Sequence, residues 1–388
     1  MSAATPRRLA QRLGWTKASD GRGGDWEACG GAAKFNLEKL VGRGSYGQVC
    51  AATQISDGKP VAVKRVVGAF DSRRDALCII REVRILAALP RHDNIVNLLD
   101  VRTPLEDPSD DADVFLIFEK AATDLEKVVA SNQYFTGDHI RWLSLDLLRG
   151  LRWLHSAGVV HRDLKPANVL VDRAGHVALC DFGIAAACSE TMKTPHKKKG
   201  AKTPATPRRR SFCGTIDYMA PELLRGEPYD DGVDWWALGC VFHELLSGKP
   251  PFSRDRPRDM FCAILREEPP SLIVKCGVEC NDAVQGLLKK SSGERFNGDA
   301  LRSHAFFGDV DWSKMERKEV APPHVPVLKP YLVETPAGVR CVEMGKLPRL
   351  NDDGESSDED DSSSARRAGT APRRVQDAFS GFAYAGDD

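Results

Sequence analysis

This 388-residue sequence lacks several features that mark other classes of protein. No apolar run is long enough to cross a bilayer, so we expect no membrane-spanning helix. The first residues lack the apolar segment of a signal peptide, and the eleven cysteines form no paired CxxC framework for disulfides or zinc. Basic and acidic residues balance at 55 each, which favours neither nucleic acid nor any other charged partner. We therefore expect reduced thiols in a cytoplasmic or nuclear protein without a nucleic-acid partner.

The order of the sequence patterns predicts two lobes between an arm and a tail. Residues 1–33 are rich in glycine, alanine and arginine, so we expect a flexible arm, although Trp15 and Trp26 are candidates for docking. Residues 34–118 alternate short β runs with glycines. Residues 122–310 show mainly helical periodicity.

Each lobe also contains an element of the other kind. A helical segment near Asp75–Leu89 interrupts the β runs, and a hairpin of Val169–Val171 with Val177–Leu179 interrupts the helices. The sequence thus predicts an α+β fold over residues 34–310, with a small antiparallel β-sheet lobe carrying one key helix and a larger, mainly helical lobe. Residues 311–388 remain as a tail.

Two segments have strongly biased charge. Lys193–Arg210, inside the helical lobe, has eight basic residues and no acid. Asp352–Asp361, in the tail, has seven acids with serines around them. Both compositions predict disorder. The two segments could attract each other, or they could stay apart as solvated charge runs.

A glycine-rich segment at Val41–Val49 reads G-x-G-x-x-G-x-V between two predicted strands. Glycines let a backbone lie close over a triphosphate, where a Cβ would collide. Alone the pattern is weak, because an ordinary glycine-rich hairpin turn looks the same. The residues that would contact a nucleotide are Gly42, Arg43, Gly44, Ser45, Tyr46, Gly47 and Val49.

A V-A-V-K strand at Val61–Lys64 follows this segment. Lys64 would hold the α and β phosphates of ATP, with Ala62 beside the nucleotide. Glu82, on the predicted helix, is the candidate partner of Lys64, and a surface glutamate is the alternative. A buried Lys–Glu pair is costly unless it has a purpose, and positioning a phosphate contact is such a purpose.

The strongest signal is an ordered set of three motifs. They are H-R-D-L-K-P-A-N at His161–Asn168, D-F-G at Asp181–Gly183 and A-P-E at Ala220–Glu222. Phosphoryl transfer depends mainly on alignment and on charge stabilisation. In that chemistry Asp163 accepts the hydroxyl proton and Lys165 neutralises charge on the transferred group. Asn168 and Asp181 supply hard oxygen ligands for Mg²⁺.

With these motifs in order, residues 35–310 resemble the eukaryotic protein kinase domain. The resemblance implies Mg-ATP as cofactor and protein substrates that receive the γ-phosphoryl. Lys165–Ala167 and Thr215 follow the serine/threonine pattern rather than the tyrosine pattern. The resemblance also implies ATP-site roles for the gatekeeper Phe118, for Glu119 and Ala121 in the hinge, for Asp124 near the ribose and for Leu170.

The same resemblance implies internal supports for the site. The stacked spine would be Leu86, Leu98, His161 and Phe182. Asp234 would brace the catalytic loop, and Arg295 would pair with Glu222.

Different segments resemble different kinase groups. Asn94–Val101 and Ala122–Lys127 are similar to mitogen-activated and cyclin-dependent kinases. Ser211–Tyr218 and the tail are similar to the AGC group. Phe379–Tyr384 resembles the hydrophobic motif of AGC tails, which would dock on the β-sheet lobe; an unstructured aromatic end is the alternative.

Regulation and specificity follow from the activation segment. Ser211 is the predicted regulatory phosphosite, whose phosphate would pair with Arg162. An upstream activating kinase is an expected partner, and the rival sites, each followed by proline, are Thr194, Thr203 and Thr206. Met219 stands where mitogen-activated kinases carry a proline-selecting arginine. We therefore expect basic residues before the phosphoacceptor, with candidate acceptors Asp124, Asp217 and Glu244.

Two other functions share this fold. A pseudokinase acting as a binding or scaffold module would be signalled by loss of a key residue, yet Lys64, Asp163, Asn168 and Asp181 are all present. A small-molecule kinase is disfavoured by the segment Gly214–Glu222, which builds a peptide platform in protein kinases. The sequence makes no prediction of oligomeric state.

Overall fold

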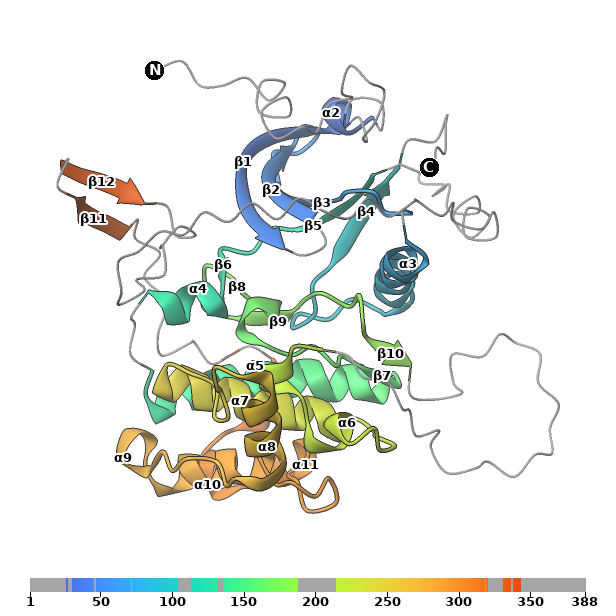
Figure 1. Ribbon diagram of the computed structural model, residues 1–388. Helices are drawn as coiled ribbons and strands as arrows, with labels where there is room; N and C mark the ends of the chain where they lie inside the picture. Colours follow the sequence, from blue (N-terminus) through green and yellow to red (C-terminus); the bar gives the residue numbers. More distant parts are fainter. Residues whose placement is uncertain are drawn as a thin grey trace. The chain divides into compact units, whose positions relative to one another are not determined.

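The computed structural model describes Trp26 and residues 30–44, 47–70, 72–103, 113–131, 135–187, 214–317, 319, 331–335 and 338–342. The chain forms two compact units (Figure 1). The first includes the chain up to Ile80 and Leu98–Lys120; the second includes Arg81–Asn97 and Ala121–Leu328. Among the described helices, none is long and apolar enough to span a membrane. The α+β, two-lobed fold class predicted from the sequence is confirmed.

The first unit is built on a five-stranded antiparallel sheet with strand order β1-β2-β3-β5-β4. The strands are β1 (Phe35–Gly44), β2 (Gly47–Gln54), β3 (Pro60–Val66), β4 (Leu98–Arg102) and β5 (Val114–Glu119). β5 is a run of apolar residues buried from Val114 to Phe118, as expected for a strand covered on both faces. Helix α3 (Arg73–Ala88) is the predicted key helix, and the division between the units falls within it, after Ile80.

One face of this sheet is covered by a residue of the predicted arm. Trp26 is 1% exposed, and its ring centroid lies 5.0 Å from that of Phe115 and 6.1 Å from that of Phe35. Helix α2 (Gly31–Lys34) follows, and the Gly31 N–H donates to the Trp26 carbonyl at 3.0 Å. A Cβ on Gly31 would overlap the indole, so glycine is required there. Trp26, a docking candidate in the sequence, is thus packed on the sheet, and α2 begins within the range expected to be an arm.

The second unit is mainly helical and contains two small sheets. Its long helices are α5 (Gly137–Ser156) and α7 (Gly232–Ser247), and the others are α4 (Leu125–Ala130), α6 (Pro221–Leu224), α8 (Pro257–Arg266), α9 (Ile273–Cys276), α10 (Val278–Leu287), α11 (Gly298–Arg302) and α12 (Trp312–Glu316). Its strands are β6 (Thr123–Asp124), β7 (Val159–Val160), β8 (Val169–Val171), β9 (Val177–Leu179) and β10 (Ala186–Ala187). Its 3₁₀ turns are η1 (Pro166–Asn168), η3 (Ile216–Tyr218) and η4 (Ala305–Phe307). The predicted hairpin is confirmed as β8 and β9, in the order β6-β8-β9.

A buried ion pair fixes the helices that follow the active-site region. Arg295 donates from its two terminal nitrogens to both oxygens of Glu222 at 2.6 and 3.0 Å, as the resemblance implied. Arg295 also donates to the Gly232 carbonyl at 2.8 Å. The same guanidinium group therefore bonds to both α6 and the start of α7. Packing continues beyond residue 310, because Trp312 lies 5.7 Å from the Phe307 ring and Met315 is buried.

Several predicted features lie outside the described residues. They are Ser45 and Tyr46, the basic segment Lys193–Arg210 with its three Thr-Pro sites, the phosphosite Ser211, the acidic segment Asp352–Asp361 and the aromatic segment Phe379–Tyr384. The tail contributes one described hairpin, β11 (Tyr331–Thr335) with β12 (Gly338–Val342).

Replacing Trp26 by alanine tests whether the sheet depends on this residue. Removing a fully buried indole should lower the free energy of unfolding by about 3–5 kcal/mol. Thermal and denaturant unfolding of Trp26→Ala measures the loss, and Trp26→Phe should lose less because an aromatic ring remains. An unchanged melting temperature in Trp26→Ala would contradict the packing described.

Candidate active site

Asp234 holds the catalytic loop from the buried start of α7. Its side chain is 0% exposed. The carboxylate accepts hydrogen bonds from the backbone N–H groups of His161 and Arg162, each at 2.8 Å, and from Nε2 of the His155 ring at 2.8 Å. Burial alone would raise the pKa of Asp234, but the hydrogen bond and charge of His155, aided by His161 and the Arg162 N–H, lower it below its ordinary value. The carboxylate therefore braces the loop in its ionised form.

Four hydrogen bonds orient the carboxylate of Asp163. Oδ1 accepts the Thr215 N–H at 3.0 Å and the Thr215 hydroxyl at 2.9 Å. Oδ2 accepts Lys165 Nζ at 2.9 Å and Asn168 Nδ2 at 3.0 Å. Lys165 Nζ also donates to the Thr215 hydroxyl at 2.9 Å. The three predicted catalytic residues thus lie together, and Thr215, flagged from sequence only as a marker of substrate type, joins them to the activation segment.

The two predicted metal ligands lie on adjoining segments. Asn168 Nδ2 donates to the Asp163 carbonyl at 2.8 Å, which leaves the amide oxygen as the remaining polar atom of the side chain. The N–H of Cys180, which precedes Asp181, donates to the Asn168 carbonyl at 3.0 Å. Asp181 has φ 66°, a left-handed conformation that is uncommon outside glycine. An amide oxygen and a carboxylate are the hard donors that Mg²⁺ accepts beside phosphate and water, so the residues fit this ion.

Contacts around the D-F-G segment connect it to the loop and to α3. His161 packs against Phe182 with ring centroids 5.0 Å apart and bonds to the Cys180 carbonyl at 2.9 Å. Arg81 donates to the Gly183 carbonyl at 2.7 Å. Sequence reasoning missed the Arg81 contact, since nothing in the motif distinguishes it from a surface arginine. Of the other spine residues, Leu86 lies in α3 and Leu98 in β4.

In the first unit, the glycine-rich segment forms the end of the β1–β2 hairpin. Gly42 is opposite Val49 and Gly44 is opposite Gly47 in the register, with Arg43 opposite Gln48. Gly47 has φ 146°, and a Cβ there would collide with the Arg65 carbonyl of β3. Glycine at this position is therefore required by the close approach of two strands, whatever it binds.

The remaining predicted ATP-site residues are divided between the units. Ala62 and Lys64 lie in β3, opposite Phe118 and Leu116 of β5, and Glu119 ends β5. In the second unit Glu82 is buried in α3, Leu170 lies in β8 opposite Asp124, and the Ala122 N–H next to Ala121 donates to the Val171 carbonyl at 2.9 Å. Asp124 caps α4 by accepting the Lys127 N–H at 2.9 Å, and it pairs with Lys127 Nζ at 2.7 Å.

Arg162, next to Asp163, reaches into the start of the activation segment. It has φ 68° and donates from Nε to the Ile184 carbonyl at 2.7 Å. A terminal nitrogen donates to the Tyr229 hydroxyl at 2.7 Å. Tyr229 is buried at 3% exposure. Sequence reasoning missed this contact, because Tyr229 follows the A-P-E motif and belongs to no motif itself.

An acidic group lies beside the segment that would receive a peptide. The Tyr218 hydroxyl donates to Glu244 at 2.5 Å. The pKa of Glu244 lies above its ordinary value, mainly because the carboxyl group is buried. The negative charges of Asp217 and Glu126 raise this pKa further, and the hydrogen bond from Tyr218 offsets part of the rise. Glu126 was not among the expected acceptors, whereas Asp124, which was, serves as a helix cap.

Comparison with known proteins agrees with this geometry. The family described as "Protein kinase domain" matches residues 35–307. Mitogen-activated protein kinase 4 of Oryza sativa subsp. japonica is 40% identical over 220 residues, which cover 56% of this chain and 55% of the relative. Serine/threonine-protein kinase Sgk2 of Mus musculus is 32% identical over 365 residues, covering 91% of this chain and 89% of the relative.

A third relative is also named as a serine/threonine-protein kinase. The RAC family serine/threonine-protein kinase homolog of Dictyostelium discoideum is 30% identical over 302 residues, covering 77% of this chain and 63% of the relative. The chain spans about half the length of the mitogen-activated kinases that it matches. The predicted likeness to both groups of serine/threonine kinases is confirmed, and the chain belongs to the protein kinase family.

Proposed function

We propose that this protein transfers the γ-phosphoryl of ATP to serine or threonine hydroxyls of protein substrates. Membership of the protein kinase family implies ATP use and protein substrates. The observation that carries the proposal is the Asp163 carboxylate, which four donors from Lys165, Asn168 and Thr215 orient at once. Such pre-positioning is what phosphoryl transfer requires of the protein.

Each residue has a distinct task in this proposal. Asp163 aims the substrate hydroxyl and accepts its proton, and Lys165, one hydrogen bond away, offsets charge on the transferred group. Asn168 and Asp181 would hold Mg²⁺, which supplies charge neutralisation for the phosphates when bound. Lys64, Glu82, the glycine-rich segment and the hinge residues keep their predicted roles in binding ATP.

The acidic group Glu126, Asp217 and Glu244 supports a preference for basic peptides. Asp217 and Glu126 act on Glu244 by repulsion, and a substrate guanidinium would relieve that repulsion while forming charge-assisted hydrogen bonds. Met219 is buried, and it occupies the position where mitogen-activated kinases carry the arginine that selects proline. A methionine offers neither a hydrogen-bond donor nor a positive charge there.

Activation by a phosphate on Ser211 belongs to the same proposal. Arg162 is held by the Ile184 carbonyl and the Tyr229 hydroxyl. A phosphate is a stronger acceptor for a guanidinium than a neutral phenol is, so phosphorylation would recruit Arg162 and order the segment around it. An upstream kinase, or the protein itself, would supply the phosphate. We place the protein in the cytoplasm or nucleus, as predicted from the sequence.

Removing the central carboxylates tests the catalytic assignment. Asp163→Asn should lower kcat by about 10²–10⁴-fold, and Asp181→Asn should abolish most Mg²⁺-dependent transfer. Transfer of labelled phosphate to a generic basic protein measures both, with Asp255→Asn, an exposed aspartate, as control. Near-normal turnover in folded Asp181→Asn would contradict the assignment, and a wild-type protein that binds ATP without transfer would indicate a pseudokinase.

Peptide kinetics test the acidic group. Glu244→Gln and Asp217→Asn should raise KM for a peptide with arginine before the serine by about tenfold, since each removes a charge-assisted contact. KM for the matching alanine peptide should change little. Glu267→Gln, on an exposed ion pair with Arg254, is the control. A strict requirement for proline after the serine in a peptide-library screen would refute this specificity.

Phosphosite mapping tests the regulatory role of Ser211. Ser211→Ala should lower activity by about tenfold or more, because Arg162 then lacks its phosphate. The triple change Thr194→Ala, Thr203→Ala and Thr206→Ala should leave activity intact. Mass spectrometry of active enzyme should find phosphate on Ser211, and full activity in Ser211→Ala would overturn the assignment.

A further inference from the structure

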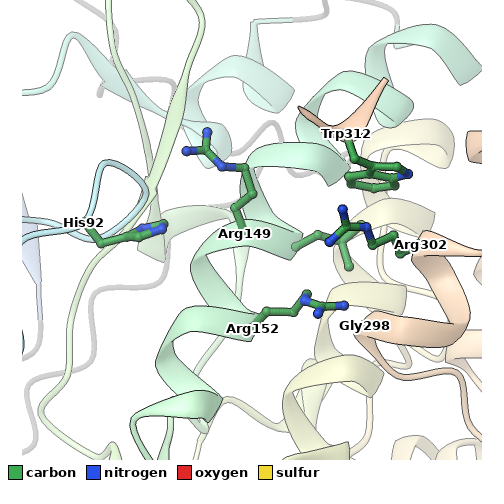
Figure 2. A pocket seen from close by; sticks show the side chains of 7 residues that line it. His92, Arg149, Arg152, Gly298, Arg302 and Trp312 are labelled. Atoms are coloured by element: carbon green, nitrogen blue, oxygen red, sulfur yellow. The ribbon is translucent and has the colours of Figure 1, made fainter. Parts of the chain in front are cut away.

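A pocket of about 270 Å³ lies in the helical unit and contains none of the residues placed around Asp163. Four segments line it: the loop after α3, the second half of α5, α11 and the start of α12. The residues that carry the argument are His92, Arg149, Arg152, Gly298, Arg302 and Trp312 (Figure 2). Three of them are arginines, two from α5 and one from α11.

The arginines come from two elements and are held in place. Arg149 and Arg152 are three residues apart on α5 and therefore share one side of the helix. The Arg302 guanidinium lies 4.9 Å from the Trp312 ring centroid, a cation–π contact that fixes it beneath the indole (Figure 2). Gly298 lets the Arg152 stem pass along α11, because a Cβ there would lie 2.8 Å from Arg152 Cγ. Arg302 is thus held against Trp312 and the Arg152 stem against Gly298, while the Arg152 side chain stays 38% exposed.

The acids near these arginines are mostly exposed. Asp299, the partner of Arg152, is 81% exposed, and Asp93, 4.0 Å from Arg149, is 56% exposed. Asp146 is buried, but its Oδ2 accepts the Val177 N–H at 3.0 Å, and its other oxygen is 3.7 Å from Arg149. Exposed ion pairs contribute little to stability. A dianion entering the pocket would therefore displace Asp299 from Arg152 at small cost.

His92 lies at the opposite side of the pocket (Figure 2). Its Nδ1 accepts the Asn94 N–H at 3.1 Å, and the ring stacks on Trp153 with centroids 5.0 Å apart. Arg152 and Arg302 thus bring two planar guanidinium groups to the pocket, and guanidinium groups suit phosphate oxygens.

The size of the pocket narrows the class of ligand. Pockets for drug-sized ligands and cofactors run from about 300 to 1,000 Å³, and this one is smaller. It suits a single phosphorylated side chain better than a nucleotide. We propose that the pocket binds a phosphoserine or phosphothreonine of a protein partner.

This binding would give the protein a preference for partners that another kinase has already modified. The consequence for substrate choice rests on the proposed kinase activity, whereas the binding step does not. Phosphate recognition at Arg152 and Arg302 would hold a partner on the helical unit while a separate serine or threonine reached Asp163.

Binding of labelled peptides tests the proposal directly. The probe is a fluorescein-labelled phosphoserine peptide pool with randomised neighbours, and the comparison is the same pool with serine. The full-length protein should bind the phosphorylated pool at least about tenfold more tightly, as expected for charge-assisted contacts to phosphate. The double variant Arg152→Gln with Arg302→Gln should lose about tenfold or more of that affinity. Arg254→Gln is the matched control, since Arg254 is 40% exposed and pairs with an exposed acid as Arg152 does.

The outcomes separate this proposal from its rivals. Equal binding of both pools, or unchanged binding in the double variant with an unchanged melting temperature, would overturn it. Inorganic phosphate should displace the peptide pool only at much higher concentrations than that of the pool. Displacement at equal concentrations would also overturn the proposal, because the site would then bind a free anion as well as it binds a phosphopeptide. All variants should phosphorylate an unmodified basic peptide at the wild-type rate. Failure of the wild-type protein in that last assay would refute the kinase activity and leave the binding result intact.

Discussion

The Asp234 carboxylate, buried where α7 begins, accepts the N–H groups of His161 and Arg162 together. Arg162 has a left-handed backbone, which costs free energy in a non-glycine residue. Without Asp234 both N–H groups would be left without that acceptor in a buried place, at the cost of unsatisfied polar groups. The conformation of the loop that carries Asp163 thus depends on a residue 71 positions later in the chain.

Because the backbone is fixed there, adjoining side chains take defined directions. Arg162 reaches the Ile184 carbonyl and the Tyr229 hydroxyl, and His161 packs on Phe182. The loop, the D-F-G segment and the residues after A-P-E are therefore joined through two consecutive side chains. Any change in the activation segment that moves Arg162 also acts on the residue beside the catalytic aspartate.

Local patterns predicted the elements whose structure is set locally. The β8–β9 hairpin follows from alternating valines around a turn, and α5 from a leucine stripe that is buried as expected. The Glu222–Arg295 pair was available only by resemblance, since 73 residues separate its members. The Tyr229 contact and the Arg149–Arg152–Arg302 pocket were missed because each depends on tertiary packing. On a helical sequence, spaced arginines look like an ordinary solvated face.

Trp26 shows that the physical domain and the family-defined domain do not begin at the same residue. The family match starts at Phe35, yet the indole nine positions earlier fills the sheet face shared by Phe35, Val63 and Phe115. A fragment cut at the family boundary would keep every catalytic motif and still expose that apolar face to water. Loss of solubility in such a fragment would then report a missing piece of core, and would say nothing about the chemistry of the active site.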